Sequence, residues 1–499
     1  MIFIGIDSGT QSTKALAIDL ESGIILAQEA RAYDVIPGLP AGHMEQHPQT
    51  WADAVDETVG AVAAQLGERK AEVRGIGVSG QQHGLVVLDA GGEVIRPAKL
   101  WCDTSTAAQC EAFSAEFGGH AGLIALAGNP VLPGYTAPKI LWIKQNEPDN
   151  FARIKTILLP HDYLNWWLTG VARMEYGDAS GTALMNLRTR EWQGELIDFI
   201  DPAVREMLPP LGSSRAVHGA LKPELAARWG FGGGVIVSAG GGDNMMGAIG
   251  TGNVQPGVVT ASLGTSGTLY AAAGSPIIDP EGEIAAFCDS TDQWMPLLCT
   301  MNVTVVTEQI RALFGMDLGG FTEAVAGAEP GAGGLMFLPY LNGERTPNLP
   351  NGSGVLHGMR TGNLTAANLA RAAMEGATLG LAYGMKRFRD LGLELSEIRL
   401  TGGGSKSAVW RQMAADAFGV PVVTLATAEG AGLGGAIQAA HAALAADGQP
   451  VEYPELCARL AQTDPAGRAE PDAKNADFYA GQLERQVDLT RKLNAAGYL

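Results

Sequence analysis

Two short turns rich in glycine and hydroxyl residues each follow an apolar run, one near the start of the chain and one past its middle. Residues 7–14 read Asp-Ser-Gly-Thr-Gln-Ser-Thr-Lys after apolar residues 2–6, and residues 264–268 read Gly-Thr-Ser-Gly-Thr after residues 258–263. Strand-like residues also follow each turn, so the pattern predicts two hairpins. Since glycine has no side chain, such turns let backbone N–H groups and hydroxyls approach a phosphate closely. Two of them in matching halves predict loops that hold one polyphosphate between them, and hence an enzyme that uses ATP.

The order of the predicted elements repeats around the two turns. In the first half a three-stranded meander, a helix and a further strand are predicted, at residues 2–6, 13–20, 24–30, 50–66 and 74–79. In the second half a hairpin is followed by alternating helices and strands, at residues 258–271, 366–381, 398–401, 407–418 and 420–425. Such repetition is typical of an internal duplication, and 499 residues exceed one ordinary core. We therefore expect two α/β domains, at residues 1–248 and 249–499, with a ligand cleft between them.

The C-terminal part is predicted to be largely helical. The Ala/Gly-rich residues 429–446 predict a helix suited to close packing, and the polar segment from Asp464 predicts a surface helix. Apolar faces on these helices could belong to the domain core or to a dimer interface, so a homodimer is one expectation.

The composition indicates a folded, acidic protein. Hydrophobic residues make up 46% of the chain and charged residues 17%, as in globular rather than disordered proteins. The formal net charge of −19 argues against a nucleic-acid partner, and no apolar run is long enough for a membrane span. The five cysteines are scattered without a CxxC pair, and the N-terminus lacks the basic region of a signal peptide. We therefore expect reduced thiols, no metal held by cysteine, and a cytoplasmic protein.

Two longer patterns resemble the signatures of a known family, the FGGY carbohydrate kinases. Residues 134–146, which read GYTAPKILWIKQN, match the first signature, and residues 352–375 match the second, above all at 358–359 and 368–375. The resemblance spans essentially the whole chain. It implies two duplicated ribonuclease H-like domains, of the type found in actin and hexokinase, around a central cleft. It also implies that a sugar and ATP are the substrates, with Mg²⁺ as the metal.

Within the family the chain is most similar to the kinases that convert D-xylulose and ATP to D-xylulose 5-phosphate and ADP. Five stretches carry this similarity, at residues 80–84, 134–142, 159–164, 241–244 and 337–347. Two positions depart from the pattern: Gln82 stands where bacterial members commonly have Met, and Ser105 stands where the motif Trp-x-Asp-x-Arg has Arg. A kinase for ribulose, a hexulose, glycerol or another polyol is therefore an alternative. A non-catalytic actin-like or sugar-sensing relative is a further one.

Asp243 is the candidate catalytic residue. It follows three glycines at a strand end and precedes a predicted helix, so it could serve only as a helix N-cap. The resemblance implies a further role as the general base, which accepts the proton of the sugar hydroxyl while that oxygen attacks the γ-phosphorus. Asp7 could be a turn-forming residue, but the resemblance implies that it holds Mg²⁺ through water.

The nucleotide is expected at three glycine-containing loops. The resemblance implies phosphate contacts from the two turns and adenosine contacts from a third loop, at Gly9, Thr10, Ser12, Thr13, Lys14, Gly264, Thr265, Ser266, Gly403, Gly404 and Ser407. Lys14 could instead be a solvated strand residue, and the second turn could be an ordinary hairpin turn. Ser407 could be either a helix cap or a nucleotide contact.

The sugar is expected in the first half of the chain. The resemblance implies contacts from two loops and from the residues around the candidate base, namely Gln82, His83, Trp101, Asp103, Asp243 and Asn244. His83 could instead be a structural residue, and Trp101 could stack on the sugar or fill the core. Arg345 is expected to pair with Glu344 or another acid and is not part of the predicted site.

Overall fold

Two seven-stranded sheets form the framework of the chain, of which the computed structural model describes residues 1–427 and 429–499. The first sheet has the order β13-β14-β5-β1-β2-β3, and β15 also pairs with β5. β1 is antiparallel to β2 and parallel to β5, and β5 is parallel to β14. The strands are β1 (Ile2–Ser8), β2 (Ser12–Asp19), β3 (Ile25–Ala32), β5 (Val73–Gly80), β13 (Val217–Ala220), β14 (Ile236–Ser238) and β15 (Gly241–Gly242).

The second sheet repeats this plan in the order β18-β19-β17-β16-β22-β23-β24. β16 takes the place of β1, since it is antiparallel to β17 and parallel to β22. The strands are β16 (Gly257–Leu263), β17 (Gly267–Ala271), β18 (Ala285–Cys288), β19 (Trp294–Thr300), β22 (Leu395–Thr401), β23 (Val422–Leu425) and β24 (Thr463–Ala469). The predicted fold class, two duplicated ribonuclease H-like α/β domains, is confirmed.

One expectation about the C-terminus is wrong. The segment from Asp464 first forms β24, which pairs with the outer side of β23, and only then the helix α18 (Ala473–Ala495). β24 supplies backbone hydrogen-bond partners for the open edge of β23. The polar sequence of this segment does not by itself reveal the pairing.

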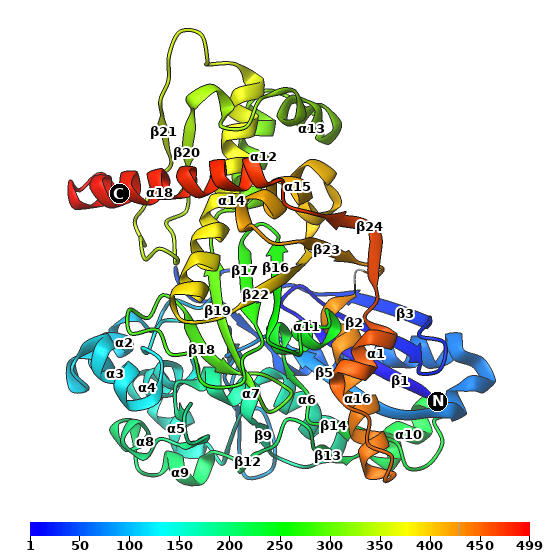
Figure 1. The fold of residues 1–499 in the computed structure, drawn as a ribbon. Helices are drawn as coiled ribbons and strands as arrows, with labels where there is room; N and C mark the ends of the chain where they lie inside the picture. The colour runs from blue at the N-terminus through cyan, green and yellow to red at the C-terminus, as the bar shows by residue number, and fades with distance from the viewer. Residues whose placement is uncertain (428) are drawn as a thin grey trace.

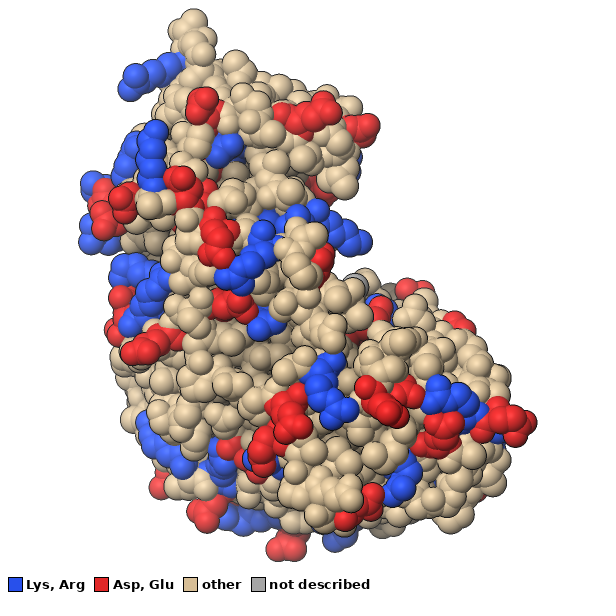
Figure 2. Space-filling model, turned by 45° about the vertical axis from the view of Figure 1, so that its right-hand side comes forward, with Lys and Arg blue, Asp and Glu red and all other residues tan. Residues whose placement is uncertain are grey.

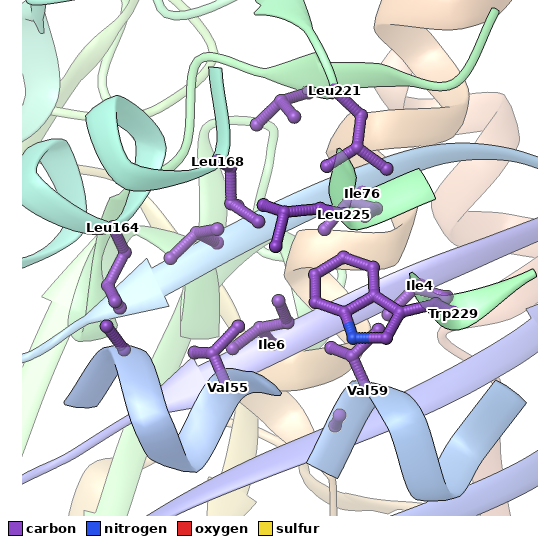
Figure 3. Packing of buried hydrophobic residues seen from close by; sticks show 14 of the residues in the cluster. Ile4, Ile6, Val55, Val59, Ile76, Leu164, Leu168, Leu221, Leu225 and Trp229 are labelled. Atoms are coloured by element: carbon purple, nitrogen blue, oxygen red, sulfur yellow. The ribbon is translucent and has the colours of Figure 1, made fainter. Parts of the chain in front are cut away.

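The first sheet is covered on one face by α1 (Pro48–Leu66), α6 (Pro160–Thr169) and α10 (Pro223–Trp229). Figure 3 shows Val55 and Val59 of α1 facing Ile4 and Ile6 of β1, with Trp229 beside them. The apolar residues of α1 recur every three or four positions, so they form one stripe along the helix that the sheet buries.

The other face of the first sheet is covered by a helix from the second half of the chain. α16 (Gly430–Ala446) packs on β1 and β5 and beside α11 (Asp243–Gly250). A Cβ on Gly5 would lie 1.8 Å from the carbonyl oxygen of Gly432, and one on Gly434 would lie 1.9 Å from that of Met246. Glycine is therefore required where these backbones touch. Since α16 completes the core of the first sheet, the division at residues 248 and 249 stays a prediction.

The remaining elements surround the two sheets. Those of the first half are β4 (Glu45–Gln46), η1 (Gly67–Glu72), β6 (Val86–Leu88), β7 (Ala98–Lys99), α2 (Ala107–Glu116), α3 (Gly119–Ala127), α4 (Thr136–Asn146), α5 (Pro148–Arg153), β8 (Thr156–Leu158), β9 (Met174–Glu175), α7 (Tyr176–Ala179), η2 (Ser180–Thr182), β10 (Met185–Asn186), β11 (Glu191–Trp192), α8 (Gly194–Ile200), α9 (Val204–Met207) and β12 (Leu211–Gly212). Those of the second half are α12 (Thr304–Leu313), α13 (Leu318–Gly327), η3 (Ala332–Gly334), β20 (Met336–Leu338), β21 (Val355–His357), α14 (Ala366–Asp390), η4 (Gly403–Lys406), α15 (Ala408–Phe418) and α17 (Tyr453–Leu460).

The two sheets lie in two bodies, with β16, β17 and β22 reaching down toward α11 in the middle of the molecule (Figure 1). Figure 2 shows the outline hollowed between the upper body and the lower right body. Within residues 1–427 and 429–499, the structure contains no helix with the length and apolar character needed to traverse a bilayer.

Candidate active site

The carboxyl ends of three parallel strands meet at one edge of the first sheet. Asp7 lies near the end of β1, and Asp243 follows β15 directly. β15 places Gly242 opposite Gly80 at the end of β5, and β1 places Asp7 opposite Ser79. In open α/β sheets, ligands bind outside the carboxyl ends of such strands. The topology therefore brings both candidate acids to the edge where a substrate would lie.

Asp243 presents one carboxylate oxygen that the protein does not use. Its Oδ1 accepts hydrogen bonds from the backbone N–H of Asn244 at 2.8 Å and from the Asn244 side-chain amide at 3.0 Å. Among the described residues, no donor bonds to its Oδ2. Burial, the carboxylate of Asp7 and that of Asp178 raise the pKa of Asp243 to about 7. Gly242, and not Asp243, is the N-cap residue of α11, so helix capping does not account for this carboxylate.

Asp7 has the surroundings of a cation ligand. Burial raises its pKa, and this is only partly offset by Lys14 and by a hydrogen bond from the Ser79 hydroxyl at 3.3 Å. Lys14 itself pairs with Glu429 at 3.7 Å. Asp7 is half-buried and close enough to Asp243 to raise the pKa of that residue, and a carboxylate in such a place fits a hard divalent cation such as Mg²⁺.

A second group of acids is occupied by a lysine. His43, Glu45 and Asp103 lie close enough together to hold a metal ion. The ammonium of Lys99 lies among them, 3.1 Å from Glu45 Oε1 and 3.2 Å from Asp103 Oδ2, and it donates to Ser105 at 2.8 Å. This buried cation already supplies the positive charge that the acids require, so the group does not fit a metal.

Asp103 and Trp101 lie in the same loop but differ in exposure. Asp103 is fully buried, and its oxygens accept from the backbone N–H of Met44 and from Ser105. Trp101 is 40% exposed and donates from its indole N–H to Thr10 at 3.0 Å. Asp103 therefore holds the loop together, whereas Trp101 is partly exposed beside the first turn.

The loop after β5 holds His83 in a left-handed conformation, with φ of 61°. The buried ammonium of Lys139 donates to the His83 carbonyl at 2.6 Å and to the Gly134 carbonyl at 2.7 Å. The His83 ring packs against Tyr135 and Phe287, at 4.9 and 5.7 Å between ring centres, and these two rings also contact one another. Burial and Lys139 lower the pKa of His83 to about 3, so its imidazole is neutral. A strained, braced backbone of this kind is typical of a binding loop.

Gln82 connects this loop to the candidate base. Its Oε1 accepts from the Asn244 side-chain amide at 2.8 Å, and Asn244 also donates to Asp243. Gln82 is buried, and its amide nitrogen lies 3.2 Å from the Met245 sulfur. The structure therefore joins three of the predicted sugar-site residues in one hydrogen-bonded group.

The first turn is closed by a hydrogen bond from the Gly9 N–H to the Ser12 carbonyl at 3.0 Å. The Gly9 carbonyl accepts from the Tyr33 hydroxyl at 2.7 Å. Gly9, Thr10 and Ser12 are partly exposed. Thr13 is buried, and its hydroxyl bonds to those of Ser8 and Tyr33. The structure therefore brings the turn, but not the Thr13 hydroxyl, to the surface.

The second turn and the third loop lie against one another. Thr265 and Ser266 are exposed, and the carbonyls of Gly264 and Thr265 accept from the start of α12. β16 and β22 are parallel, so the turn after β16 and the loop after β22 share an edge. Gly403 is exposed, and a Cβ there would meet no atom within 4 Å, whereas Gly404 is buried against Leu263.

Ser407 accepts a hydrogen bond from the Trp410 N–H at 3.3 Å and is the N-cap residue of α15. The Ser407 side chain therefore caps the N-terminus of α15, directly after the glycine loop.

Arg345 lies near the sugar loop, contrary to the expectation of an ion pair. Glu344 accepts instead from Asn302 and from backbone N–H groups, and within the described part of the chain Arg345 makes no ion pair. Burial and Lys139 are the larger causes of the low pKa of His83, and the guanidinium of Arg345 lowers this pKa further. Burial raises the pKa of Cys299, and Arg345 acts in the opposite direction.

Asp178 is a second residue that the sequence reasoning missed. It is fully buried and acts on the pKa of Asp243, although it precedes Asp243 by a long stretch of chain. No local motif marks it.

Comparison with known proteins gives a consistent result. The pattern of the N-terminal domain of the FGGY family of carbohydrate kinases matches residues 2–250, and that of its C-terminal domain matches residues 259–443. A xylulose kinase of Haemophilus influenzae is 43% identical, over 97% of this chain and 99% of that protein. A xylulose kinase of Escherichia coli is 35% identical, over 84% of this chain and 85% of that protein.

A solved structure agrees with these sequence matches. The xylulose kinase from Bifidobacterium adolescentis superimposes with a TM-score of 0.83 at 30% identity, over 97% of this chain and 99% of that one. The duplicated sheets, the two glycine turns and the acids at the strand ends thus occur in a chain whose two halves match one family. The chain belongs to the FGGY family of carbohydrate kinases.

Proposed function

We propose that the protein transfers the γ-phosphoryl group of ATP to D-xylulose and releases D-xylulose 5-phosphate and ADP. The observation that carries this proposal is the unused Oδ2 of Asp243 at the carboxyl ends of the strands. The relatives named xylulose kinase, which match nearly the whole chain, support the choice of sugar.

In this reaction Asp243 accepts the proton of the sugar hydroxyl as that oxygen bonds to the γ-phosphorus and the bond to the β–γ bridging oxygen breaks. The pKa of about 7 makes the carboxylate a competent base near neutral pH. Most of the rate in phosphoryl transfer comes from positioning and charge stabilisation.

The sugar is proposed to lie between the His83 loop and Trp101. The neutral imidazole of His83 offers its Nε2 to a sugar hydroxyl, because its Nδ1 is buried beside Gly181. The partly exposed Trp101 is proposed to stack its indole on the sugar. Arg345 supplies a positive charge toward the transferred group.

Asp7 is the residue that would hold Mg²⁺ through water, and the metal would neutralise charge on the phosphates. Gly9, Thr10 and Ser12 on one side, and Gly264, Thr265 and Ser266 on the other, are proposed to hold the phosphates. Gly403 and Gly404 are proposed to lie beside the adenosine, since the open space at Gly403 permits close approach. Closure of the two bodies would exclude water, which otherwise competes with the sugar for the γ-phosphoryl group.

A cytoplasmic location is proposed from the free cysteines and from the need for ATP. Five free cysteines fit a reducing compartment, and the cytoplasm is where ATP is available. Acidic and basic side chains are interspersed on the face in Figure 2, which supports a small-molecule substrate rather than nucleic acid. A homodimer stays a prediction.

A coupled assay of ADP release tests the proposal with a panel of D-xylulose, D-ribulose, L-ribulose, D-fructose and glycerol. D-Xylulose is expected to give the highest kcat/KM. Another sugar that exceeds it would overturn the substrate assignment while leaving the kinase assignment intact.

A kinase for another sugar is the second candidate, and Gln82 and Ser105 are the observations that favour it. Both replace residues of the usual pattern within the predicted sugar site.

A further inference from the structure

A buried imidazole lies behind the sugar loop, between two carboxylates. His161 is fully buried, with Nδ1 2.8 Å from Asp178 Oδ2 and Nε2 2.9 Å from Asp162 Oδ1. Although burial opposes a charge, Asp162 and Asp178 hold the pKa of His161 well above its usual range. A Cβ on Gly80 would lie 2.8 Å from the His161 Cβ, so the imidazolium lies directly under the end of β5.

The second oxygen of Asp178 has no partner of its own. Among the residues that the structure describes, no donor forms a hydrogen bond of ordinary geometry to the buried Asp178 Oδ1. It lies beside Gly242, where a Cβ would be 3.0 Å from this oxygen and 2.6 Å from the Cγ of Gln82. Both side chains therefore flank the same glycine, immediately before Asp243.

Gln82 has a donor left for this oxygen. Its Oε1 is used by Asn244, and its amide nitrogen approaches only the Met245 sulfur, which is a weak acceptor. Burial raises the pKa of Asp178, and His161 and the Gln82 amide both act in the opposite direction. The spare N–H of Gln82 is thus close enough to the Asp178 carboxylate to lower its pKa, although the two groups do not form a hydrogen bond of ordinary geometry.

We propose that His161 and Asp178 are positioning residues that act on Asp243 through Gln82 and Asn244. The imidazolium fixes the Asp178 carboxylate, which fixes the orientation of the Gln82 amide. Gln82 then accepts from Asn244, and Asn244 donates to Asp243 Oδ1, so that Oδ2 is held toward the sugar hydroxyl. This inference rests on the proposed role of Asp243 as the base.

A double-mutant cycle on kcat tests the proposal. Asp178→Asn removes the charge, and Gln82→Met removes the connecting amide while keeping the side-chain length. Each single variant is expected to lower kcat by about tenfold, with the KM for ATP unchanged, because a misplaced base costs roughly this much. Asp178→Asn is expected to change kcat less than about twofold in the Gln82→Met protein, since the connection is already broken.

Independent effects would overturn the proposal: if the two changes multiply to about a hundredfold loss, Asp178 does not act through Gln82. Unchanged kcat in both single variants would also overturn it. Asp289→Asn is the matched control, because Asp289 is also buried but its carboxylate, within the described residues, accepts only from Thr291 and Gln293 of its own loop. This variant is expected to keep the wild-type kcat.

The assay uses whichever sugar of the panel is turned over fastest, so a wrong choice of sugar does not affect the cycle. The role of the base is tested separately by Asp243→Ala. An active Asp243→Ala variant would refute the proposed base, whereas multiplying effects at positions 178 and 82 would refute only the positioning role. The melting temperature of each variant identifies any general loss of structure.

Discussion

Burial and the carboxylate of Asp7 together raise the pKa of Asp243 to about 7. Asp7 lies in β1 and Asp243 begins α11 directly after β15, and the parallel pairing of β1 and β15 with β5 brings them to the same edge. Two carboxylates held this way destabilise one another when both are ionised, so the site favours a cation or a proton. The following predictions depend on this arrangement.

Replacement of Asp243 by Ala is expected to lower kcat by on the order of 10³-fold or more, since a general base contributes an effect of that size. Sugar and ATP are expected to bind with affinities near those of the wild type, because other groups make most of the contacts. Rapid-quench kinetics measure the first quantity and titration calorimetry the second. Near-normal turnover by this variant would contradict the assignment.

The pH dependence of kcat/KM for the sugar is expected to follow the free carboxylate of Asp243. Activity should fall about tenfold per pH unit below a pKa of about 7 and level off above it, because only the ionised form accepts a proton. Initial rates at subsaturating sugar from pH 5 to 9 measure this. A profile that is flat from pH 5 to 9 would show that another group is the base.

Asp243 should also reduce stability at alkaline pH. Its pKa is about 7 in the folded state and near 3.8 when unfolded, so the folded state binds the extra proton and stability falls as pH rises between these values. Asp243→Asn is therefore expected to be more stable than the wild type at pH 8, by on the order of 1 kcal/mol after solvent screening. Thermal unfolding at pH 5 and 8 measures the difference, which should be larger at pH 8. A variant that melts lower at pH 8 would contradict this.

The contact between α16 and α11 is expected to tolerate only glycine at position 434. A Cβ there would lie 1.9 Å from the Met246 carbonyl oxygen, so Gly434→Ala should destabilise the protein by roughly 3 kcal/mol. Gly380→Ala is the control, because that glycine lies within α14 and its Cβ would meet nothing within 4 Å. The control is expected to gain up to about 1 kcal/mol from helix propensity. Denaturant unfolding compares the two, and equal stabilities would disprove the close packing.

Arg345→Met is expected to lower kcat/KM by roughly tenfold, because an unpaired guanidinium near the sugar loop stabilises transferred charge. The melting temperature should stay within a degree or two of the wild type, on the order of what a surface change produces. Steady-state kinetics and calorimetry separate the two effects. A variant with lower stability and unchanged kcat/KM would show that Arg345 is structural.

Several parts of the fold and site could be predicted from local patterns. The glycine turns after β1 and β16, and Asp243 between three glycines and a helix, are recognisable because their residues are neighbours in sequence. The repeated order of strands and helices likewise predicted two similar domains. The resemblance of residues 134–146 and 352–375 to the family signatures predicted the reaction, which is phosphoryl transfer from ATP to a sugar.

Other features depend on contacts between distant segments. Gln82 meets Asn244, Lys99 lies among the acids of two loops, and α16 completes a sheet that belongs to the first half of the chain. No local spacing marks these pairs, because sheet topology and backbone packing bring them together. The sequence alone thus determined the elements, the phosphate-type turns and the candidate base. The tertiary structure decided which carboxylate is free, which is neutralised and which cation is unpaired, because burial and charge depend on neighbours that only folding supplies.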